Sequence, residues 1–393
     1  MKGHVRRRGT RSWAVILDLP PGEDGKRRQK WHAVKGTKRD AERELARLIH
    51  SLNTASYVEP TKTTLAEYLE RWLETVEPTL GARTFHRYAE IARKHLVPAL
   101  GNQLLAKLQP LAINAYYAKA LKSGRRDGKG GLAARTVLHH HRVLREALQQ
   151  AVKWQILARN PDDAASPPKP AYLEMRALTE AETVWLMTAA QGLELATPVL
   201  LAVTCGLRRG EVLAVGWRDV DLEAGTLTVR RSLEQTPAGL AFKEPKNRKP
   251  RMIDLPSLMI EELVRRREEA ERQRRDLGER LRRDDLVVAR PDGSPWRPDS
   301  FTPAFRKFLE RAGLEGLRFH DLRHTHATQL LRQGVNPKIV SERLGHSSVA
   351  FTLQTYAHVL PTMQREAAGA LDRALRNAFE QQNLPPGDGA KPA

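Results

Sequence analysis

The chain begins with short apolar and aromatic runs that have the length of β-strands. These runs cover residues 5–8, 13–19 and 27–34, and a turn rich in Pro and Gly separates the last two. Apolar residues then recur at helical spacing over 37–52. The pattern predicts a small N-terminal domain over residues 1–58, made of a three-stranded sheet and one helix.

Helical spacing dominates the next hundred residues. Four helices are predicted. The first begins at Thr64, and the other three cover 82–96, 111–121 and 133–152. Residues 122–131 are charged and rich in Gly, as in an exposed loop. The segment 160–170 (NPDDAASPPKP) predicts an extended linker because of its Pro content. An all-helical domain is therefore expected over 63–165.

Residues 174–380 mix helical and strand patterns. The predicted helices cover 179–190, 198–204, 261–283, 301–312 and 363–379, and the predicted strands cover 226–230 and 251–255. The helix over 261–283 is densely charged, which is typical of an exposed, salt-bridged helix. Residues 381–393 are predicted to be a disordered tail. The fold class is thus multidomain and mainly α, and its last domain is mixed α+β.

The net charge of the chain says more about its partner than the rest of the composition does. The 393 residues include 66 Lys and Arg against 46 Asp and Glu, which gives a formal net charge of +20 and a pI of about 10.3. Such an excess indicates a polyanionic partner, usually nucleic acid, without separating DNA from RNA. Basic residues gather in the N-terminal domain and on the helical domain, where they include Arg83, Arg87 and Arg93. The run His139, His140, His141 is interpreted as a wet, weakly cationic surface.

The compartment follows from what the sequence lacks. Cys205 is the single cysteine, so an internal disulfide is impossible, and its apolar surroundings predict a buried small residue. No run approaches the roughly 20 apolar residues of a membrane span, and the basic N-terminus has no apolar signal core. We expect a cytoplasmic protein without membrane contact.

Candidate chemistry gathers in residues 319–359. His320 and Arg323 stand three residues apart, so they share a face on a helix. His346 follows Gly345, a residue that can end a helix, and Tyr356 falls on the next helical segment. Arg grips phosphate oxygens, His moves protons near neutral pH, and Tyr is a nucleophile that needs activation. The segment predicts a phosphate site beside a nucleophile.

A zinc site is the competing interpretation of the same segment. His320, His324 and His326 could share a metal, because residues four apart lie on one helix face. However, the sequence has no HExxH motif, and its single Cys cannot supply a ligand set. We therefore expect neither a metal nor a cofactor.

A second motif upstream decides between these interpretations. Residues 204–217 read TCGLRRGEVLAVGW. Together with HDLRH, LGH and the late Tyr, this motif resembles the tyrosine recombinase, or phage integrase, family. The resemblance places the family's catalytic set on Arg208, Lys246, His320, Arg323, His346 and Tyr356. It covers almost the whole chain, and the combination of motifs is very specific.

Two assignments within that set involve a choice. The family places its Arg directly after GL, which selects Arg208 over Arg209, and Glu211 is expected to buttress that Arg or the fold. The family carries its catalytic Lys on a β-hairpin, where Lys246 is the best match in this chain. Many relatives have Thr where this chain has Asn247, so Lys243 and Lys249 stay open.

The resemblance implies a metal-free transesterification. Arg208 and Arg323 would stabilise charge on the phosphate, Tyr356 would attack phosphorus to give a 3′-phosphotyrosyl enzyme, and Lys246 would protonate the leaving 5′-oxygen. His320 would position or deprotonate the tyrosine, and His346 would hydrogen-bond a phosphate oxygen.

The resemblance also implies partners. Residues 1–58 would bind arm-type DNA sites, 63–165 would be the helical, SAM-like core-binding domain, and 174–380 the catalytic domain. Four copies would act together on core and arm sites of double-stranded DNA, with accessory DNA-bending or directionality proteins possible.

The leading hypothesis is a site-specific integrase of a phage or another mobile genetic element. A type IB topoisomerase would share the tyrosine attack but act alone. A DNA-binding regulator would bind without cutting, although the complete catalytic set argues against it. A metallohydrolase would lose its activity in chelator.

Overall fold

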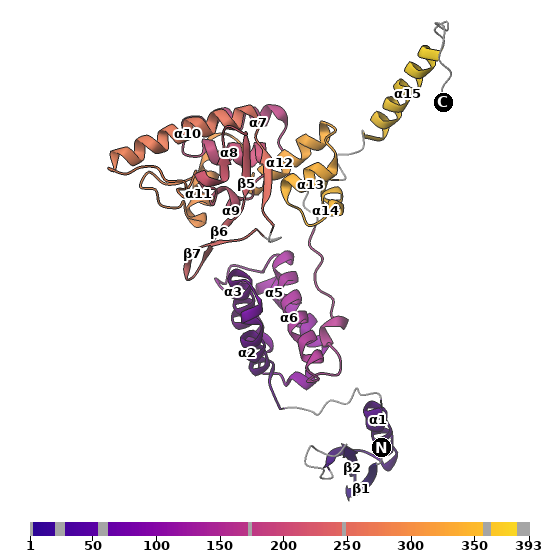
Figure 1. The fold of residues 1–393 in the computed structure, drawn as a ribbon. Coiled ribbons are helices and arrows are strands. Elements are labelled where there is room, and N and C mark those ends of the chain that lie inside the picture. The colour runs from indigo at the N-terminus through magenta and orange to yellow at the C-terminus, as the bar shows by residue number, and fades with distance from the viewer. Residues whose placement is uncertain are drawn as a thin grey trace. The chain divides into compact units, whose positions relative to one another are not determined.

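The computed structural model describes residues 3–19, 28–53, 62–171, 175–245, 249–356 and 363–382. The chain divides into two compact units, Met1–Tyr172 and Leu173–Ala393. Figure 1 shows the elements of each unit, which are described separately below. The expectation of a multidomain, mainly helical chain with a small N-terminal sheet is confirmed.

The first unit begins with the expected sheet and helix. Strands β1 (Gly3–Gly9), β2 (Ser12–Leu19) and β3 (Arg28–Lys35) pair antiparallel in that order, and α1 (Lys38–Asn53) follows. One face of the sheet is apolar, so Val15 and Leu17 pack with the buried side of α1. The turn predicted between the last two strands lies outside the described residues.

The rest of the first unit is a helical bundle. Its helices are α2 (Leu65–Val76), α3 (Ala82–Ile91), α4 (Val97–Leu100), α5 (Pro110–Ser123) and α6 (Ala134–Lys153). Thr64 begins α2 with a reciprocal capping box to Glu67, and Tyr68 and Trp72 fill the core. The predicted helix over 82–96 continues through a π-helical turn, Ala92–Leu96, into α4.

The histidine run on α6 corrects one prediction. His140 is 1% exposed rather than wet, and its Nδ1 lies 2.7 Å from the hydroxyl of Tyr116. Burial lowers the pKa of His140 to about 4, so the ring is neutral at physiological pH. The prediction of a cationic surface was therefore wrong at this position, which lies on the apolar stripe of the helix.

The predicted linker also starts later than expected. Its first residues form a 3₁₀ turn, Pro161–Ala164, that packs on the bundle. Asp162 is buried there: it accepts a hydrogen bond from the Tyr117 hydroxyl at 2.9 Å and lies 3.0 Å from Nδ1 of His141. These contacts hold the turn against α5 and α6, so residues 161–164 belong to the helical bundle.

The second unit combines helices with two small sheets. Its helices are α7 (Glu180–Ala190), α8 (Ala196–Cys205), α9 (Arg209–Val212), α10 (Ser257–Asp276), α11 (Pro298–Arg311), α12 (Phe319–Arg332), α13 (Pro337–Leu344), α14 (Val349–Tyr356) and α15 (Met363–Gln382). Strands β4 (Val220–Asp221), β5 (Thr226–Val229) and β8 (Arg251–Asp254) form one antiparallel sheet.

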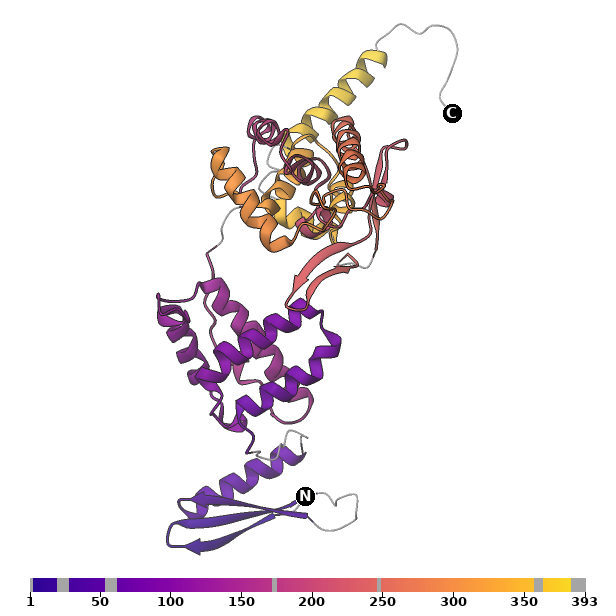
Figure 2. The ribbon, with the colours of Figure 1, turned by 90° about the vertical axis from the view of Figure 1, so that its left-hand side faces the viewer.

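The sequence analysis expected a hairpin here but did not predict that two more strands lie between the two predicted ones. Strands β6 (Ser232–Thr236) and β7 (Gly239–Lys243) pair antiparallel, and Figure 2 shows this hairpin reaching out from the body of the second unit. Part of the connection between β5 and β8 is therefore this hairpin, and the lysine-rich segment 243–249 begins at its end.

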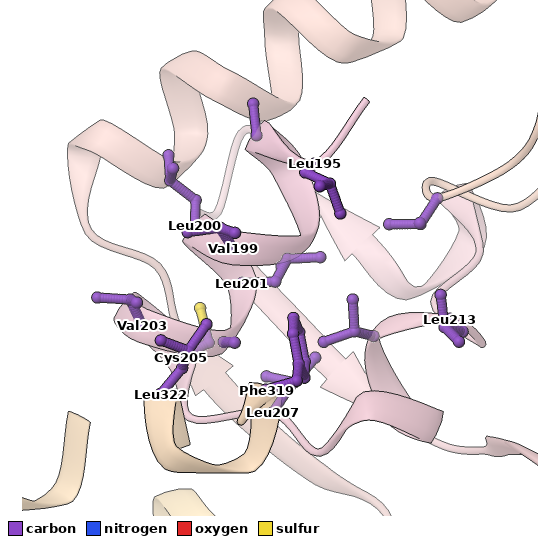
Figure 3. Packing of buried hydrophobic residues seen from close by; sticks show 14 of the residues in the cluster. Leu195, Val199, Leu200, Leu201, Val203, Cys205, Leu207, Leu213, Phe319 and Leu322 are labelled. Carbon is purple, nitrogen blue, oxygen red and sulfur yellow. The ribbon is translucent and has the colours of Figure 1, made fainter. Parts of the chain in front are cut away.

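Helix α8 is the centre of the second unit. It is apolar on all sides, as the sequence predicts, and it packs against α12 in one core cluster (Figure 3). Cys205 is a free thiol buried in this cluster beside residues such as Leu322, which confirms it as a small core residue. The close packing of α8 on α12 brings the two sequence motifs together.

Helix α10 is shorter than its charge pattern suggests. It ends at Asp276 instead of continuing to residue 283, and Gly278 in the following turn has a φ of 73°. Glycine adopts this left-handed conformation without steric cost, so it stops the helix. Arg265 forms an ion pair with Glu262 on the exposed side, as expected of a salt-bridged helix, while Leu263 packs inward.

Candidate active site

Helix α12 presents the HDLRH motif. Asp321 accepts a hydrogen bond from the backbone N–H of Arg318 at 2.8 Å and so fixes the start of the helix. His320 lies exposed in the first turn, whereas Arg323 is 2% exposed and His324 is half-buried. The helical register therefore places three candidate groups at different depths of one site.

Arg323 is held by two backbone carbonyls from different segments. Its guanidinium donates to the carbonyl of Gly206 at 2.6 Å and to that of Leu344 at 2.5 Å. Burial and the nearby charge of Arg208 lower its pKa to about 9, which leaves it cationic at neutral pH. The side chain thus ties α12 to the end of α8 and the end of α13.

Arg208 approaches the same place from the other motif. It lies at the N-terminus of α9, and its guanidinium donates to the carbonyl of Gly345 at 3.2 Å. The carbonyls bound by Arg208 and Arg323 belong to consecutive residues, so the two cations converge. Arg209 turns elsewhere, toward the carbonyl of Pro298 at 3.3 Å. Arg208 is therefore the one of the two arginines that lies beside Arg323, and its catalytic assignment stays a prediction.

Glu211 buttresses the site, as expected. Its carboxylate accepts from Nη1 of Arg208 at 2.8 Å and from Nη1 and Nη2 of Arg251 at 3.1 and 2.7 Å. Burial alone would raise the pKa of this carboxyl, but the two arginines outweigh burial and hold it at about 2. A permanent anion with two permanent cations fixes the position of Arg208.

Two glycines of the GLRRGE motif are required by close packing. Gly206 ends α8 with a φ of 65°, and a Cβ there would lie 2.6 Å from Cδ2 of His326 and 2.7 Å from Leu344. A Cβ on Gly210 would lie 2.7 Å from the carbonyl oxygen of Leu233 on β6. The motif therefore serves the packing of α8 and α9 as well as the site.

His346 follows the left-handed Gly345 that ends α13. Its Nδ1 lies 2.7 Å from the hydroxyl of Thr352 on α14. Burial, Arg323 and Arg208 lower the pKa of His346 to about 3, so the ring is neutral at physiological pH. A neutral imidazole held in this way can donate a hydrogen bond from its other nitrogen.

Tyr356 is the last residue of α14 and is 1% exposed. Its ring packs with Ala327 and Leu331 of α12, and its hydroxyl lies 2.8 Å from Nδ1 of His324. Burial raises the pKa of Tyr356 to about 12. The structure thus brings the candidate nucleophile to α12, but places His324 against its hydroxyl, whereas the sequence analysis assigned that place to His320.

The lysine assignment stays a prediction. Lys246 lies outside the described residues. Lys243, on β7, forms an ion pair with Glu234 of β6 at 2.6 Å, so its ammonium already has an anionic partner within the hairpin. Lys249 lies exposed before β8.

The histidines of the zinc alternative have other roles in the structure. Nδ1 of His326 lies 2.8 Å from the carbonyl of Val203, and its Nε2 lies 3.3 Å from Nε of Arg343. Within the described residues, no group of three or more His, Cys, Asp or Glu side chains could hold a metal ion. His326 is therefore a packing residue, and the contacts of His324 point to the tyrosine.

Comparisons with known proteins point to one family. Residues 176–363 match the model of the phage integrase family, and residues 64–121 match that of the phage integrase N-terminal SAM-like domain. A tyrosine recombinase XerC-like protein of Caldanaerobacter subterraneus is 26% identical, with 94% of this chain and 98% of the relative covered.

Solved structures share the fold at low identity. The Tn1549 transposon integrase bound to transposon right end DNA gives a TM-score of 0.67 at 19% identity, covering 79% of this chain and 100% of that one. A lambda integrase tetramer bound to a Holliday junction gives a TM-score of 0.53 at 20% identity, covering 88% and 95%.

In the part of the chain that the structure describes, no helix is long and apolar enough to cross a membrane.

Both motifs meet at α8 and α12, and both family models match in the expected order. The chain therefore belongs to the phage integrase family of tyrosine recombinases.

Proposed function

We propose that the chain is a site-specific DNA recombinase of a phage or another mobile genetic element, which cuts and rejoins DNA through a 3′-phosphotyrosyl intermediate. The observation that carries the proposal is the convergence of Arg208 and Arg323 on the consecutive carbonyls of Leu344 and Gly345, next to His346. A phosphodiester bound there would meet two cations and a hydrogen-bond donor, with Tyr356 on the adjoining helix.

The cationic pair acts mainly by electrostatic stabilisation. Negative charge develops on the non-bridging oxygens as the tyrosine oxygen approaches phosphorus, and preorganised donors lower that barrier most. Arg208 and Arg323 are fixed by carbonyl and carboxylate partners before DNA arrives, so little reorganisation is needed. Loss of either guanidinium should cost about 3 kcal/mol of transition-state stabilisation.

The remaining chemistry belongs to proton transfer. Lys246, on the segment after β7, protonates the leaving 5′-oxygen, and His346 hydrogen-bonds a phosphate oxygen. His320, exposed at the start of α12, contacts the scissile phosphate. Rejoining reverses the step when a 5′-hydroxyl of another strand attacks, so the reaction uses no external energy source.

The partners follow from the charge and from the related structures. The net charge of +20 favours a polyanionic ligand, and we take double-stranded DNA as the ligand of both units because the similar Tn1549 integrase was solved with transposon right end DNA. The N-terminal sheet binds arm sites and the helical bundle clamps the core site, with four copies assembled on the DNA, as in the lambda integrase tetramer on a Holliday junction. The chain acts in the cytoplasm at the nucleoid, with accessory DNA-bending or directionality proteins.

A two-duplex exchange experiment separates this proposal from its alternatives. A supercoiled plasmid carrying the DNA that flanks the gene is incubated with a labelled linear duplex carrying the partner site. Transfer of label into the plasmid supports a recombinase, whereas relaxation of the plasmid without transfer supports a type IB topoisomerase. Binding on a native gel with neither product supports a DNA-binding regulator.

A further inference from the structure

The hydroxyl of Tyr356 is hydrogen-bonded to a histidine outside the set assigned to the reaction. Nδ1 of His324 lies 2.8 Å from that hydroxyl, and the two rings lie 5.8 Å apart, centroid to centroid. His324 follows His320 by one helical turn, and the two histidine rings meet edge to face at 4.8 Å. Two histidines thus stand in a row between the surface and the nucleophile.

We propose that His324, rather than His320, accepts the proton of the Tyr356 hydroxyl when the tyrosine attacks phosphorus. This inference rests on the proposed function, since it assigns a proton acceptor to that reaction. It makes His324 a catalytic residue, because its ring nitrogen touches the reacting oxygen.

The protonation states before the reaction allow this role. Burial and the neighbouring His320 lower the pKa of His324 to about 4, so its ring is neutral and one nitrogen can accept a proton. Burial raises the pKa of Tyr356 to about 12, so its hydroxyl remains protonated at neutral pH and requires a base. Besides His320, the charged groups that act on the pKa of His324 are Asp321, which raises it, and Arg323 and Arg318, which lower it.

The other two histidines of the site are placed for different contacts. Nδ1 of His346 faces the hydroxyl of Thr352 at 2.7 Å, and burial together with the charges of Arg323 and Arg208 lowers the pKa of this ring. His320 is exposed whereas Tyr356 is 1% exposed, and among the described contacts His320 reaches the tyrosine through the ring of His324. An exposed ring suits a phosphate contact, and the deeper ring suits the tyrosine.

The step balances without any further reactant. The O–H bond of Tyr356 breaks and its proton passes to Nδ1 of His324, which becomes an imidazolium. The freed electron pair forms the bond from the tyrosine oxygen to phosphorus. The bond from phosphorus to the 5′-oxygen breaks, and that oxygen takes a proton from Lys246. Rejoining returns the proton from the imidazolium of His324 to the tyrosine oxygen.

The test compares His324→Asn with His320→Gln in the full chain, on the nicked duplex that the wild-type chain cleaves. The asparagine oxygen lies close to the place of Nδ1, so it keeps the hydrogen bond but cannot accept the proton. We expect adduct formation to slow by about 10²- to 10⁴-fold with unchanged DNA binding. The rate of His324→Asn should also rise tenfold per pH unit, as hydroxide replaces the base, whereas His320→Gln keeps the wild-type profile.

Two further measurements guard against a merely structural effect. A substrate with sulfur at the 5′-bridging position has a leaving group that needs no proton, so it should rescue Lys246→Ala but not His324→Asn. Free imidazole should restore part of the rate of His324→Ala. Rescue of His324→Asn by the sulfur substrate would count against the proposal. So would a folded His324→Ala variant whose rate imidazole does not restore.

The outcomes separate the inference from the proposed function. A wild-type chain that binds the duplex without forming an adduct removes both. A wild-type chain that cleaves, with His324→Asn cleaving within threefold of it, removes only the inference. A faster reaction in His324→Ala would also overturn it, because His324 would then be a latch on the tyrosine. Transfer of the hydroxide dependence to His320→Gln would return the role to His320.

Discussion

Glu211 and Arg251 form a bidentate ion pair next to Arg208. The two guanidinium nitrogens of Arg251 lie 3.1 and 2.7 Å from the carboxylate oxygens of Glu211, which is 2% exposed. The same carboxylate accepts a hydrogen bond from Nη1 of Arg208 at 2.8 Å. One buried anion therefore connects Arg251 of strand β8 to Arg208 at the start of α9.

Replacing Glu211 with Gln should destabilise the second unit. The variant leaves Arg251 buried without its anion, and breaking a buried pair in this way costs about 3–5 kcal/mol. Urea unfolding, followed by hydrogen exchange of peptides from α8 and α9, measures the change in the free energy of unfolding. Glu310→Gln is the matched control, because its partner Arg306 is exposed and lies 3.7 Å away. Equal stability of the two variants would contradict the role of the pair.

The same carboxylate should make stability depend on pH in the acid range. Its folded pKa of about 2 lies below its ordinary value, so the pair stabilises the fold above the unfolded pKa. That contribution, about 3 kcal/mol, should disappear as the pH falls from about 5 to about 2. Glu211→Gln should lose this part of the pH dependence in urea titrations, and an unchanged slope would contradict the assignment.

Gly206→Ala should be much more harmful than Gly192→Ala. Both glycines have a positive φ, 65° and 75°, so both variants carry the left-handed penalty of about 1–2 kcal/mol. A Cβ at position 192 meets nothing within 4 Å, whereas one at 206 would lie 2.6 Å from Cδ2 of His326. Thermal unfolding of the two variants isolates the packing term, which vanishes if their melting temperatures are equal.

The neighbouring arginines of the GLRRGE motif provide a matched pair for catalysis. Arg208→Lys removes a fixed planar donor from the phosphate site and should slow adduct formation by about 10²-fold or more. Arg209→Lys, which changes contacts to α11, should leave the rate within a few fold. Single-turnover cleavage of a nicked duplex measures both. Equal losses would mean that the motif supports the fold and not the phosphate.

The lysine assignment can be decided by three alanine variants. Lys246→Ala should abolish most cleavage, because the leaving 5′-oxygen then lacks its proton donor. Lys243→Ala should retain cleavage, since that ammonium pairs with Glu234 inside the hairpin at 2.6 Å. Lys249→Ala should also retain it. Cleavage of the nicked duplex by the three variants under the same conditions gives the answer, and loss in Lys243→Ala alone would reassign the role.

Local periodicity explains most of what the sequence could predict. Thr64 and Thr179 start helices α2 and α7 with capping boxes, and the all-apolar run of α8 is buried as expected. Gly345 ends α13 in the left-handed conformation. Each of these features depends on residues within one or two helical turns of each other, so it can be predicted from one amino-acid sequence.

Three features were predicted wrongly or not at all, because a second pattern in the same residues pointed to another structure. His140 lies three residues after Val137 and four before Leu144, on the buried stripe of α6, yet the run of histidines suggested a wet face. Pro237 and Gly239 mark the turn between β6 and β7, although β6 (SLEQT) is mostly polar. Charge continued past Asp276, although Gly278 indicated the end of α10.

The contact between His324 and Tyr356 could not be read from the sequence. It depends on how α14 packs against α12, which is a tertiary relationship between residues 32 positions apart. The same holds for the meeting of Arg208 with the carbonyl of Gly345, 137 positions away. Motif resemblance selected the residues, but only the packing of α8, α12 and α14 shows which side chains touch.

The most direct test of the account is the covalent intermediate itself. The full chain is mixed with a nicked duplex carrying the DNA that flanks its gene, so that the short fragment beyond the cut diffuses away and traps the adduct. A denaturing gel should show a protein–DNA band, and mass spectrometry of the digested adduct should place the phosphate on Tyr356, with no band from Tyr356→Phe. Duplex that is bound on a native gel but yields no adduct, or an adduct that persists in Tyr356→Phe, would contradict the account.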